Sequence, residues 1–383
     1  DLLCRADTVG TFQVESRAQM ATLPIMQPQE FYDVAIEVAL IRPGPIVGDL
    51  VHPYLNRRTG REEIDYIHPL FEPILKRSLG VPIFQEQVLR MAMTIADFTG
   101  TEADELRRAM SCKRSDERMV TVSDKLRVRM TSKGIAKNVQ EKVIHSIGSF
   151  ALYGFPESHA ISFALIAYSS CWLKVHRTAE FYCGLINNQP MGFYSVSSLM
   201  QDAKRHGVQC KAVCVINSAA QTTVIDDGLL RLGLDRIKGL QQQTIERLEE
   251  ARVRGEFESL PDFLTRVRPN KKERRLLAAA GALNELPEVA HRRDALWQAE
   301  RLPKDDLFAN ATSSKEKVLP QMTPVERLGT DLMIQGHSVG PHPMRLWRKE
   351  HGDEITHSGH LSQMTHGTPV RIAGLVICRQ RPG

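Results

Sequence analysis

The stretch Y-G-F-P-E-S-H-A-I-S-F-A-L-I-A-Y-S-S-C-W-L-K, residues 153–174, carries the strongest structural signal in this chain. A polar turn that ends in Ser158 and His159 runs directly into a segment with apolar residues on nearly every side of a helix. Because such helices are normally buried, the pattern predicts a rigid, buried helix over about 160–187. We expect Ser158 to cap its N-terminus, where free N–H groups suit a phosphate. The alternative is that Ser158 only caps the helix.

The composition is that of a globular protein with basic concentrations. With 383 residues, 42% hydrophobic and 25% charged, the chain is expected to form about two or three domains. A net charge of +5 is weak, but Lys and Arg outnumber Asp and Glu nine to five over 103–133 and eight to three over 264–293. These concentrations suit a polyanion such as nucleic acid. Solvated helix faces are the alternative.

Cysteines and apolar runs indicate the compartment. The seven cysteines are scattered and lack C-x-x-C spacing, which favours reduced thiols in a cytoplasmic protein. The best apolar run, 160–173, is shorter than the ~20 residues that span a bilayer. The chain has no initiator Met and stops just after a strand-like run, so we expect a fragment.

The pattern along the chain predicts a mainly α fold, α+β overall. Helices are expected over 88–149, with a break at Thr99 and Gly100, and over 193–205. A strand is expected over 208–215, a turn at Asp227 and Gly228, a polar linker over 303–323, and β-like structure in the last forty residues.

Residues 232–252 resemble a helix-hairpin-helix, with two short helices that meet at Lys238, Gly239 and Leu240. In this motif the backbone N–H groups of a glycine-rich turn grip a DNA phosphate without reading sequence. Gln241 replaces the usual second glycine. A second helical pair is expected over 260–267 and 273–283.

A row of cations is expected near residue 107. If one helix runs through L-R-R-A-M-S-C-K-R, then Arg107, Arg114, Arg118 and Lys125 fall within about 20° of one line on its surface. Arginine forks suit phosphate oxygens, so this row suits a triphosphate or a strand backbone. The alternative is that these cations form salt bridges with the nearby acids Asp104, Glu105, Asp116 and Glu117.

Catalytic metal ligands are not evident in the sequence. Two-metal phosphoryl transfer needs gathered carboxylates, but there is no Asp-x-Asp pair, and the doublets at 226–227 and 305–306 lie in a turn and a linker. The six histidines between His337 and His366 lack zinc-ligand spacing. We therefore predict no metal site within this sequence.

Five motifs follow one another along the chain: D-T-V-G-T-F-Q-V-E-S-R (7–17), E-V-A-L-I-R-P-G-P-I (37–46), F-Q-E-Q-V (84–88), L-R-R-A-M-S-C-K-R-S (106–115) and G-F-P-E-S-H-A-I-S-F-A-L-I-A-Y (154–168). In this collinear order they resemble the C-family bacterial DNA polymerases, the α subunit of DNA polymerase III and its relatives. N-N-Q-P-M-G-F-Y (187–194) and G-P-H-P-M (340–344) are most similar to the error-prone, damage-inducible branch.

The resemblance implies a set of modules. Residues 1–175 would be the polymerase fingers, 176–295 a helix-hairpin-helix region, 296–345 a linker, and 346–383 the start of an OB-fold that could bind single-stranded template. The family's palm, with its catalytic aspartates and bound Mg²⁺, would precede residue 1. This fragment would therefore lack the catalytic residues.

The resemblance also implies site residues. The nucleotide-binding candidates are Arg42, Arg107, Arg108, Lys113, Arg114, Ser158 and His159. The DNA-binding candidates are Lys238, Gly239, Lys271 and Lys272.

A degenerate clamp-binding motif is expected in the linker. The family's Q-x-D/S-L/M-F motif corresponds here to Lys304, Asp305, Asp306, Leu307 and Phe308. An ammonium cannot accept hydrogen bonds as a glutamine amide does, so we predict weak or no direct clamp binding and recruitment through an inactive Y-family partner.

The intact protein is thus expected to be a DNA-directed DNA polymerase for translesion synthesis in the DNA damage response. Its partners would be primer-template DNA and dNTP. The alternatives are a replicative DNA polymerase III α subunit and a non-catalytic DNA-binding protein that retains the fingers and hairpins.

Overall fold

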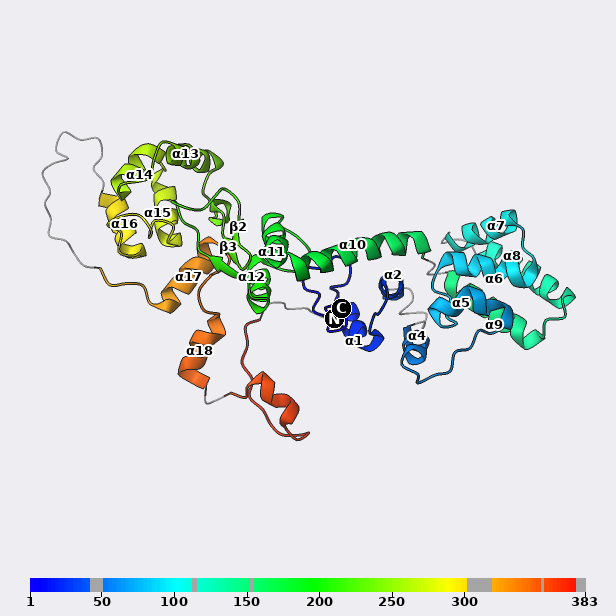
Figure 1. The fold of residues 1–383 in the computed structure, drawn as a ribbon. Helices are drawn as coiled ribbons and strands as arrows, with labels where there is room; N and C mark the ends of the chain where they lie inside the picture. The colour runs from blue at the N-terminus through cyan, green and yellow to red at the C-terminus, as the bar shows by residue number, and fades with distance from the viewer. Residues whose placement is uncertain (42–50, 112–115, 152–154, 302–318, 353–354, 377–383) are drawn as a thin grey trace, which may run out of the picture. The chain divides into compact units, whose positions relative to one another are not determined.

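The computed structural model describes all residues except 42–50, 112–115, 152–154, 302–318, 353–354 and 377–383 (Figure 1). The chain divides into two compact units, Asp1–Arg177 and Thr178–Gly383. Helices dominate both units, which confirms the mainly α prediction. The sheet found among the described residues belongs to the second unit and has three short strands.

The first unit contains a hydrophobic cluster around helix α2, Phe31–Leu40. Every residue of α2 from Asp33 onward is buried, which follows from its nearly continuous apolar sequence. Helix α10, Glu157–His176, packs against α2 with a stripe of small side chains at helical spacing. Helices α1, Arg17–Met26, and α4, Val51–Arg58, complete this cluster.

A second hydrophobic cluster in the first unit is built from four helices. Their bounds confirm the predicted helical pattern over 88–149 and its break near Thr99. Asp97, with a φ of 47°, ends the first of them in the left-handed conformation. The four helices are α6, Gln85–Ala96; α7, Gly100–Ser111; α8, Asp116–Ser132; and α9, Lys137–Ala151; the short elements η1, Pro69–Phe71, α5, Glu72–Leu75, and η2, Lys76–Ser78, precede them.

Helix α10 differs from the prediction in two respects. It ends at His176, where Arg177 leaves the helical conformation, and a separate helix α11, Thr178–Asn187, follows. It is also buried on one face only, because α2 covers only the stripe of small residues. Leu165, Ile166 and Trp172 are 58%, 50% and 47% exposed. The prediction of a single, fully buried helix was therefore wrong.

The second unit begins with α11 and α12, Val196–Arg205, followed by a small sheet. The strand order is β1 (Gln209–Lys211), β3 (Leu229–Arg231), β2 (Thr223–Asp226), with β1 parallel and β2 antiparallel to β3. The predicted turn at Asp227 and Gly228 joins β2 to β3. The strand expected over 208–215 is shorter than predicted, because β3 offers pairing partners to only three of its residues.

The remainder of the second unit is helical. Phe263 and Leu277 anchor its core. The second predicted pair is present, whereas the first arm of the pair at 232–252 is only a 3₁₀ turn. The elements are η3, Leu234–Arg236; α13, Gln242–Val253; α14, Leu260–Val267; α15, Lys271–Ala280; α16, Arg292–Arg301; and α17, Pro324–Ile334.

The C-terminal residues are helical or irregular where they are described. Helix α18, Pro343–His351, and the 3₁₀ turn η5, Ser358–Gln363, lie here, and the described part of 346–376 contains no strand. A strand needs a paired neighbour, and the hydrogen bond from Thr356 N to Arg371 O does not build a ladder. The OB-fold stays a prediction. Among the described residues, no helix combines the length and the apolarity needed to cross a bilayer.

Candidate functional site

The N-terminus of α10 carries the predicted pair Ser158 and His159, and both side chains are exposed. The helix begins at Glu157 with Pro156 as its N-cap, so the prediction that Ser158 is the cap was wrong. Pro156, with its φ fixed near −66°, starts the helix earlier than expected. The Glu86 carboxylate accepts from Glu157 N at 2.9 Å. A carboxylate therefore already engages the first N–H of this helix.

The start of α10 is fixed to the start of α6. Gln85 N donates to Phe155 O at 3.0 Å in a strand-like bridge. The Tyr32 hydroxyl donates to the Glu157 carboxylate at 2.6 Å. Burial, reinforced by Glu157, raises the pKa of Tyr32, so the phenol keeps its proton and this bond persists at neutral pH. Ser158 and His159 therefore project from a rigid junction of two helices.

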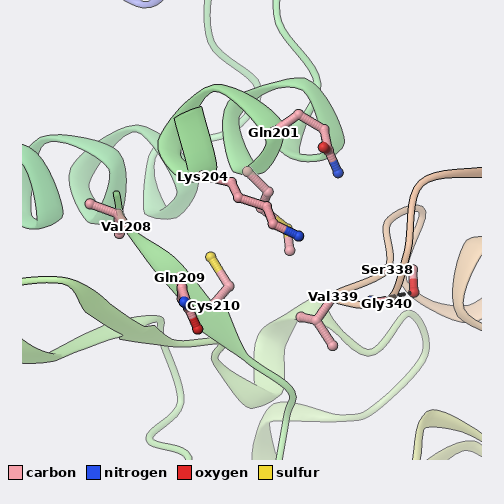
Figure 2. Close-up of a pocket in the computed structure, with 9 residues that line it drawn as sticks. Gln201, Lys204, Val208, Gln209, Cys210, Ser338, Val339 and Gly340 are labelled. Carbon is pink, nitrogen blue, oxygen red and sulfur yellow. Dashed lines mark hydrogen bonds between the residues drawn. The ribbon is translucent and has the colours of Figure 1, made fainter. Parts of the chain in front are cut away.

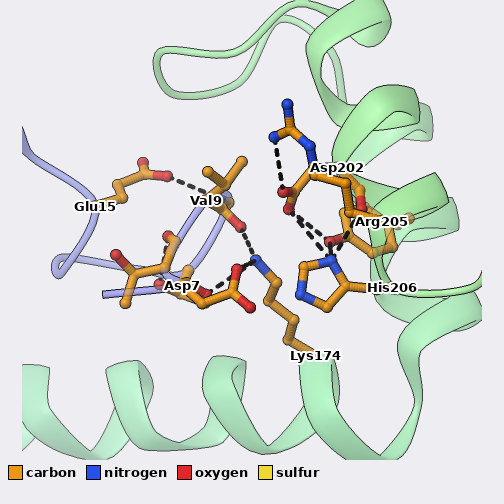
Figure 3. A network of polar contacts seen from close by, with 11 residues as sticks. Asp7, Val9, Glu15, Lys174, Asp202, Arg205 and His206 are labelled. Atoms are coloured by element: carbon orange, nitrogen blue, oxygen red, sulfur yellow. Dashed lines mark hydrogen bonds and ion pairs between the residues drawn. The ribbon is translucent and has the colours of Figure 1, made fainter. Parts of the chain in front are cut away.

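Lys174 is a structural anchor that the sequence reading missed. Its side chain is fully buried, and its Nζ donates to the carbonyl oxygens of Asp7 at 3.1 Å and Val9 at 2.9 Å (Figure 3). The Asp7 carboxylate lies 3.4 Å away. The signal that could have found it is a lysine within an otherwise apolar helix. This contact holds the loop of the D-T-V-G-T-F motif along α10.

Arg107 and Arg108 lie on α7 and both pair with Asp104, at 2.8 Å each. Hydrogen bonding from Arg107, with a smaller effect of Arg108, lowers the pKa of Asp104. The salt-bridge alternative is thus realised for Asp104, and Glu105 likewise pairs with Lys125 at 3.2 Å. Exposed pairs of this kind are weak, because water and salt screen the charges and ordering the side chains costs entropy, so another anion can displace the carboxylate.

The cation row was predicted for the case that one helix runs from Arg107 to Lys125. A single straight helix is excluded, because Lys125 on α8 pairs with Glu105 on α7 at 3.2 Å although the two are 20 residues apart. The residues between these helices, with Lys113 and Arg114, lie outside the described residues, as does Arg42. The side chain of Arg118 is not described either. Of the predicted nucleotide-binding residues, the structure thus places Arg107 and Arg108 on one helix and Ser158 and His159 on another.

The predicted hairpin turn in the second unit has most of its amides engaged. Gly239 has a φ of +89°, which favours glycine. Lys238 N donates to Ile334 O at 3.0 Å, Leu240 N to Ile237 O at 3.2 Å, and Gln241 N to the Glu273 carboxylate at 3.1 Å. Among the described residues only the Gly239 amide of this turn lacks an acceptor, so the expected backbone grip on phosphate is reduced.

The cationic side chain of Lys272 lies against that turn. A side chain added at Gly239 would meet Leu276 and Lys272 of α15, so the turn lies against this helix. Lys271, one residue earlier, is 70% exposed and lies 3.8 Å from Glu300. These lysines offer positive charge rather than hydrogen bonds in a fixed geometry. This fits binding to a phosphate backbone without sequence recognition.

A polar pocket that was not predicted lies beside β1 in the second unit. It has a volume of about 170 Å³ and is lined by Gln201, Lys204, Cys210 and the segment from Ser338 to Gly340 (Figure 2). Ser338 donates to Asp331 at 2.5 Å and accepts from Gly340 N at 3.1 Å, which orders this wall. Burial raises the pKa of Cys210 to about 11, so its thiol remains protonated at neutral pH.

Metal-ligating side chains do not cluster among the described residues of either unit. Each unit taken alone, in its described residues, brings no three Asp, Glu, His or Cys side chains within ligand distance. Asp226 and Asp227 lie exposed at the β2–β3 turn, as the sequence predicted. The doublet Asp305–Asp306, like Leu307 and Phe308 of the clamp-motif remnant, is outside the described residues.

Comparison with known proteins gives consistent matches. Residues 1–134 match the bacterial DNA polymerase III alpha subunit finger domain, and residues 207–295 match a helix-hairpin-helix motif. The chain is 44% identical to an error-prone DNA polymerase of Pseudomonas fluorescens, a match covering 100% of this chain and 38% of that protein.

Two further relatives agree. Error-prone DNA polymerases of Pseudomonas aeruginosa and Corynebacterium glutamicum are 43% and 44% identical over all of this chain, and the matches cover 38% and 36% of their own lengths. The chain therefore spans well under half the length of the relatives it matches.

Proposed function

We propose that this chain belongs to the C family of bacterial DNA polymerases, and that the whole protein is a template-directed DNA polymerase of the error-prone branch. Similarity to error-prone DNA polymerases along all of this chain is the observation that carries the proposal. The reaction joins a dNMP to a primer 3′-OH and releases pyrophosphate. Mg²⁺, held by carboxylates outside this sequence, would neutralise developing phosphate charge.

The proposed role of the first unit is to hold the incoming dNTP. Arg107 and Arg108 are exposed cations in exchangeable ion pairs, and Ser158 and His159 are exposed on a fixed helix start. Guanidinium groups bind phosphate oxygens through paired, charge-assisted hydrogen bonds. We extend the proposal to Arg42, Lys113 and Arg114, with residues 1–175 acting as the fingers.

The proposed role of residues 176–295 is to hold duplex DNA. Lys238, Lys271 and Lys272 supply charge around the Gly239 turn. Fluorescence anisotropy against salt concentration tests this. Lys272→Ala should weaken binding equally for all duplex sequences and reduce the salt slope by about 1, whereas Lys349→Ala on α18 should leave the slope unchanged. Equal slopes in all three proteins would refute the assignment.

Primer extension by the whole protein tests the polymerase itself. The expected result is template-directed incorporation that also proceeds opposite damaged bases. Strict arrest at every lesion would favour the replicative α subunit, and absence of any extension would favour a non-catalytic DNA-binding protein.

Partner recruitment is proposed to run through an inactive Y-family protein, with only indirect contact to the sliding clamp. A fluorescence titration of peptide 301–311 against the clamp checks this. A micromolar or tighter constant would show that Asp306, Leu307 and Phe308 still form a working clamp motif.

A further inference from the structure

His159 is part of an aromatic column at the start of α10. Its ring centroid lies 4.2 Å from that of Phe163, at an interplanar angle of 86°, and 5.0 Å from that of Phe155, at 68°. Phe163 in turn stacks on Phe12, with centroids 5.4 Å apart and rings within 3° of parallel. Edge-to-face and offset-stacked pairs are the arrangements that aromatic rings prefer. The imidazole is therefore oriented by rings on both sides.

The outer ring of the column is itself fixed to α10. Phe12 N donates to Ser170 Oγ at 3.0 Å, across 158 residues of sequence. The preceding loop is held by Lys174 through the carbonyl oxygens of Asp7 and Val9. A buried ammonium is stable only with such partners. If this loop left α10, the Lys174 charge would remain buried without hydrogen-bond acceptors, which is costly. Phe12 is thus kept in place on Phe163.

Simple core filling does not account for the column. His159 is exposed and Phe12 is 37% exposed, so the stack reaches the surface where the proposed nucleotide site lies. The exposed His159 ring gains little from burial, and what the stack provides for it is direction. The D-T-V-G-T-F motif, which has no other assigned role, contributes the outermost ring.

We infer that Phe163 and Phe12 are positioning residues that set the orientation of the His159 imidazole toward the incoming nucleotide. The inference rests on the proposed function of this site. Phe163 orients His159 directly, and Phe12, held by Ser170 and the Lys174 loop, keeps Phe163 in its rotamer.

Steady-state single-nucleotide incorporation by the whole polymerase provides the first test. Phe163→Leu should raise the dNTP KM about three- to tenfold, with kcat and DNA affinity nearly unchanged. Phe163→Tyr, which keeps the ring, should restore the KM. Tyr168→Leu is the matched control, because Tyr168 lies on the same helix and makes an edge-to-face pair with Phe31, 6.3 Å away, that does not involve His159.

NMR of ¹³Cε1-labelled histidine in the 383-residue chain provides the second test. The His159 signal is identified by its loss in His159→Gln. It should shift in Phe163→Leu and in Phe12→Leu, and stay in place in Tyr168→Leu and Phe163→Tyr. Phe12 is partly exposed, so its variant keeps the test usable if Phe163→Leu fails to fold.

The outcomes separate the two claims. A dNTP KM that is unchanged in His159→Gln would overturn the proposed nucleotide site. If His159→Gln raises the KM while Phe163→Leu and Phe12→Leu alter neither the KM nor the His159 signal, the positioning inference is overturned and the site stands.

Discussion

Glu37 is expected to make the first unit less stable as pH rises. Its side chain lies fully buried on α2, and neither carboxylate oxygen has a hydrogen-bond partner among the described residues. The nearby Tyr54 hydroxyl is also buried without a partner there. Burial raises the pKa of Glu37 to about 8, so the folded protein holds this proton at neutral pH.

The size and sign of this change in the free energy of unfolding follow from proton linkage. Between the ordinary pKa of 4.5 and the folded pKa of about 8, the folded chain binds a proton that the unfolded chain releases. Each pH unit across this window lowers the free energy of unfolding by about 1.4 kcal/mol. The loss is absent below the window and reaches about 5 kcal/mol above it.

Urea unfolding at several pH values between 5 and 9, monitored through amide exchange in α2, measures this loss in the free energy of unfolding. Glu37→Gln keeps the shape but cannot ionise, so its stability should exceed that of the wild type increasingly as pH rises. Glu63→Gln, at an exposed position, is the control and should follow the wild type. Parallel pH dependences for the wild type and Glu37→Gln would refute the reasoning.

Three further predictions concern packing. Asp331→Ala removes the carboxylate that Arg292 contacts at 2.6 Å and should destabilise α17 by about 3 kcal/mol, seen as faster amide exchange; unchanged exchange would contradict this. Gly281→Ala combines a φ of +78° with a contact 2.6 Å from Arg292 Nε, so it should reduce the free energy of unfolding by about 1–3 kcal/mol, seen as a lower Tm; an unchanged Tm would contradict this. Leu165→Ser with Trp172→Ser should reduce binding of an apolar dye to α10, and equal dye binding would show that this face is covered.

Local pattern predicted much of the fold. The helices over 88–149 follow from apolar spacing, and the break before α7 follows from Thr99 and Gly100. The turn at Asp227 and Gly228 follows from turn chemistry. Each of these features depends on residues close in sequence, which is why periodicity and turn composition were sufficient.

Features that depend on distant residues were not predicted. The sequence of α10 is apolar on nearly every side, which indicates that the helix needs packing partners. It does not indicate that α2 covers only one face of the helix. Pro156 moved the helix start, and Glu86, 71 residues away, supplies the partner for its first N–H. The anchor between Lys174 and Asp7 spans 167 residues and has no local signal beyond a lysine in an apolar helix.

Within the candidate site, residue types were easier to predict than their partners. The cations and the acids near Arg107 are evident in the sequence. Whether the cations bind phosphate or form salt bridges with those acids was left open. The structure realises the ion pair between Arg107 and Asp104. The amides of the hairpin turn were expected to be free, but α17 and α15 engage them through Ile334 and Glu273.

The dNTP dependence of primer extension by Arg107→Ala, compared with Asp104→Asn, tests the central claim most directly. If Arg107 exchanges its bond with Asp104 for a nucleotide phosphate, Arg107→Ala should raise the dNTP KM or lower kcat about ten- to a hundredfold, with DNA affinity unchanged. Asp104→Asn, which leaves the arginine in place, should keep the KM or lower it. An unchanged dNTP dependence in Arg107→Ala would show that this arginine serves only its salt bridge.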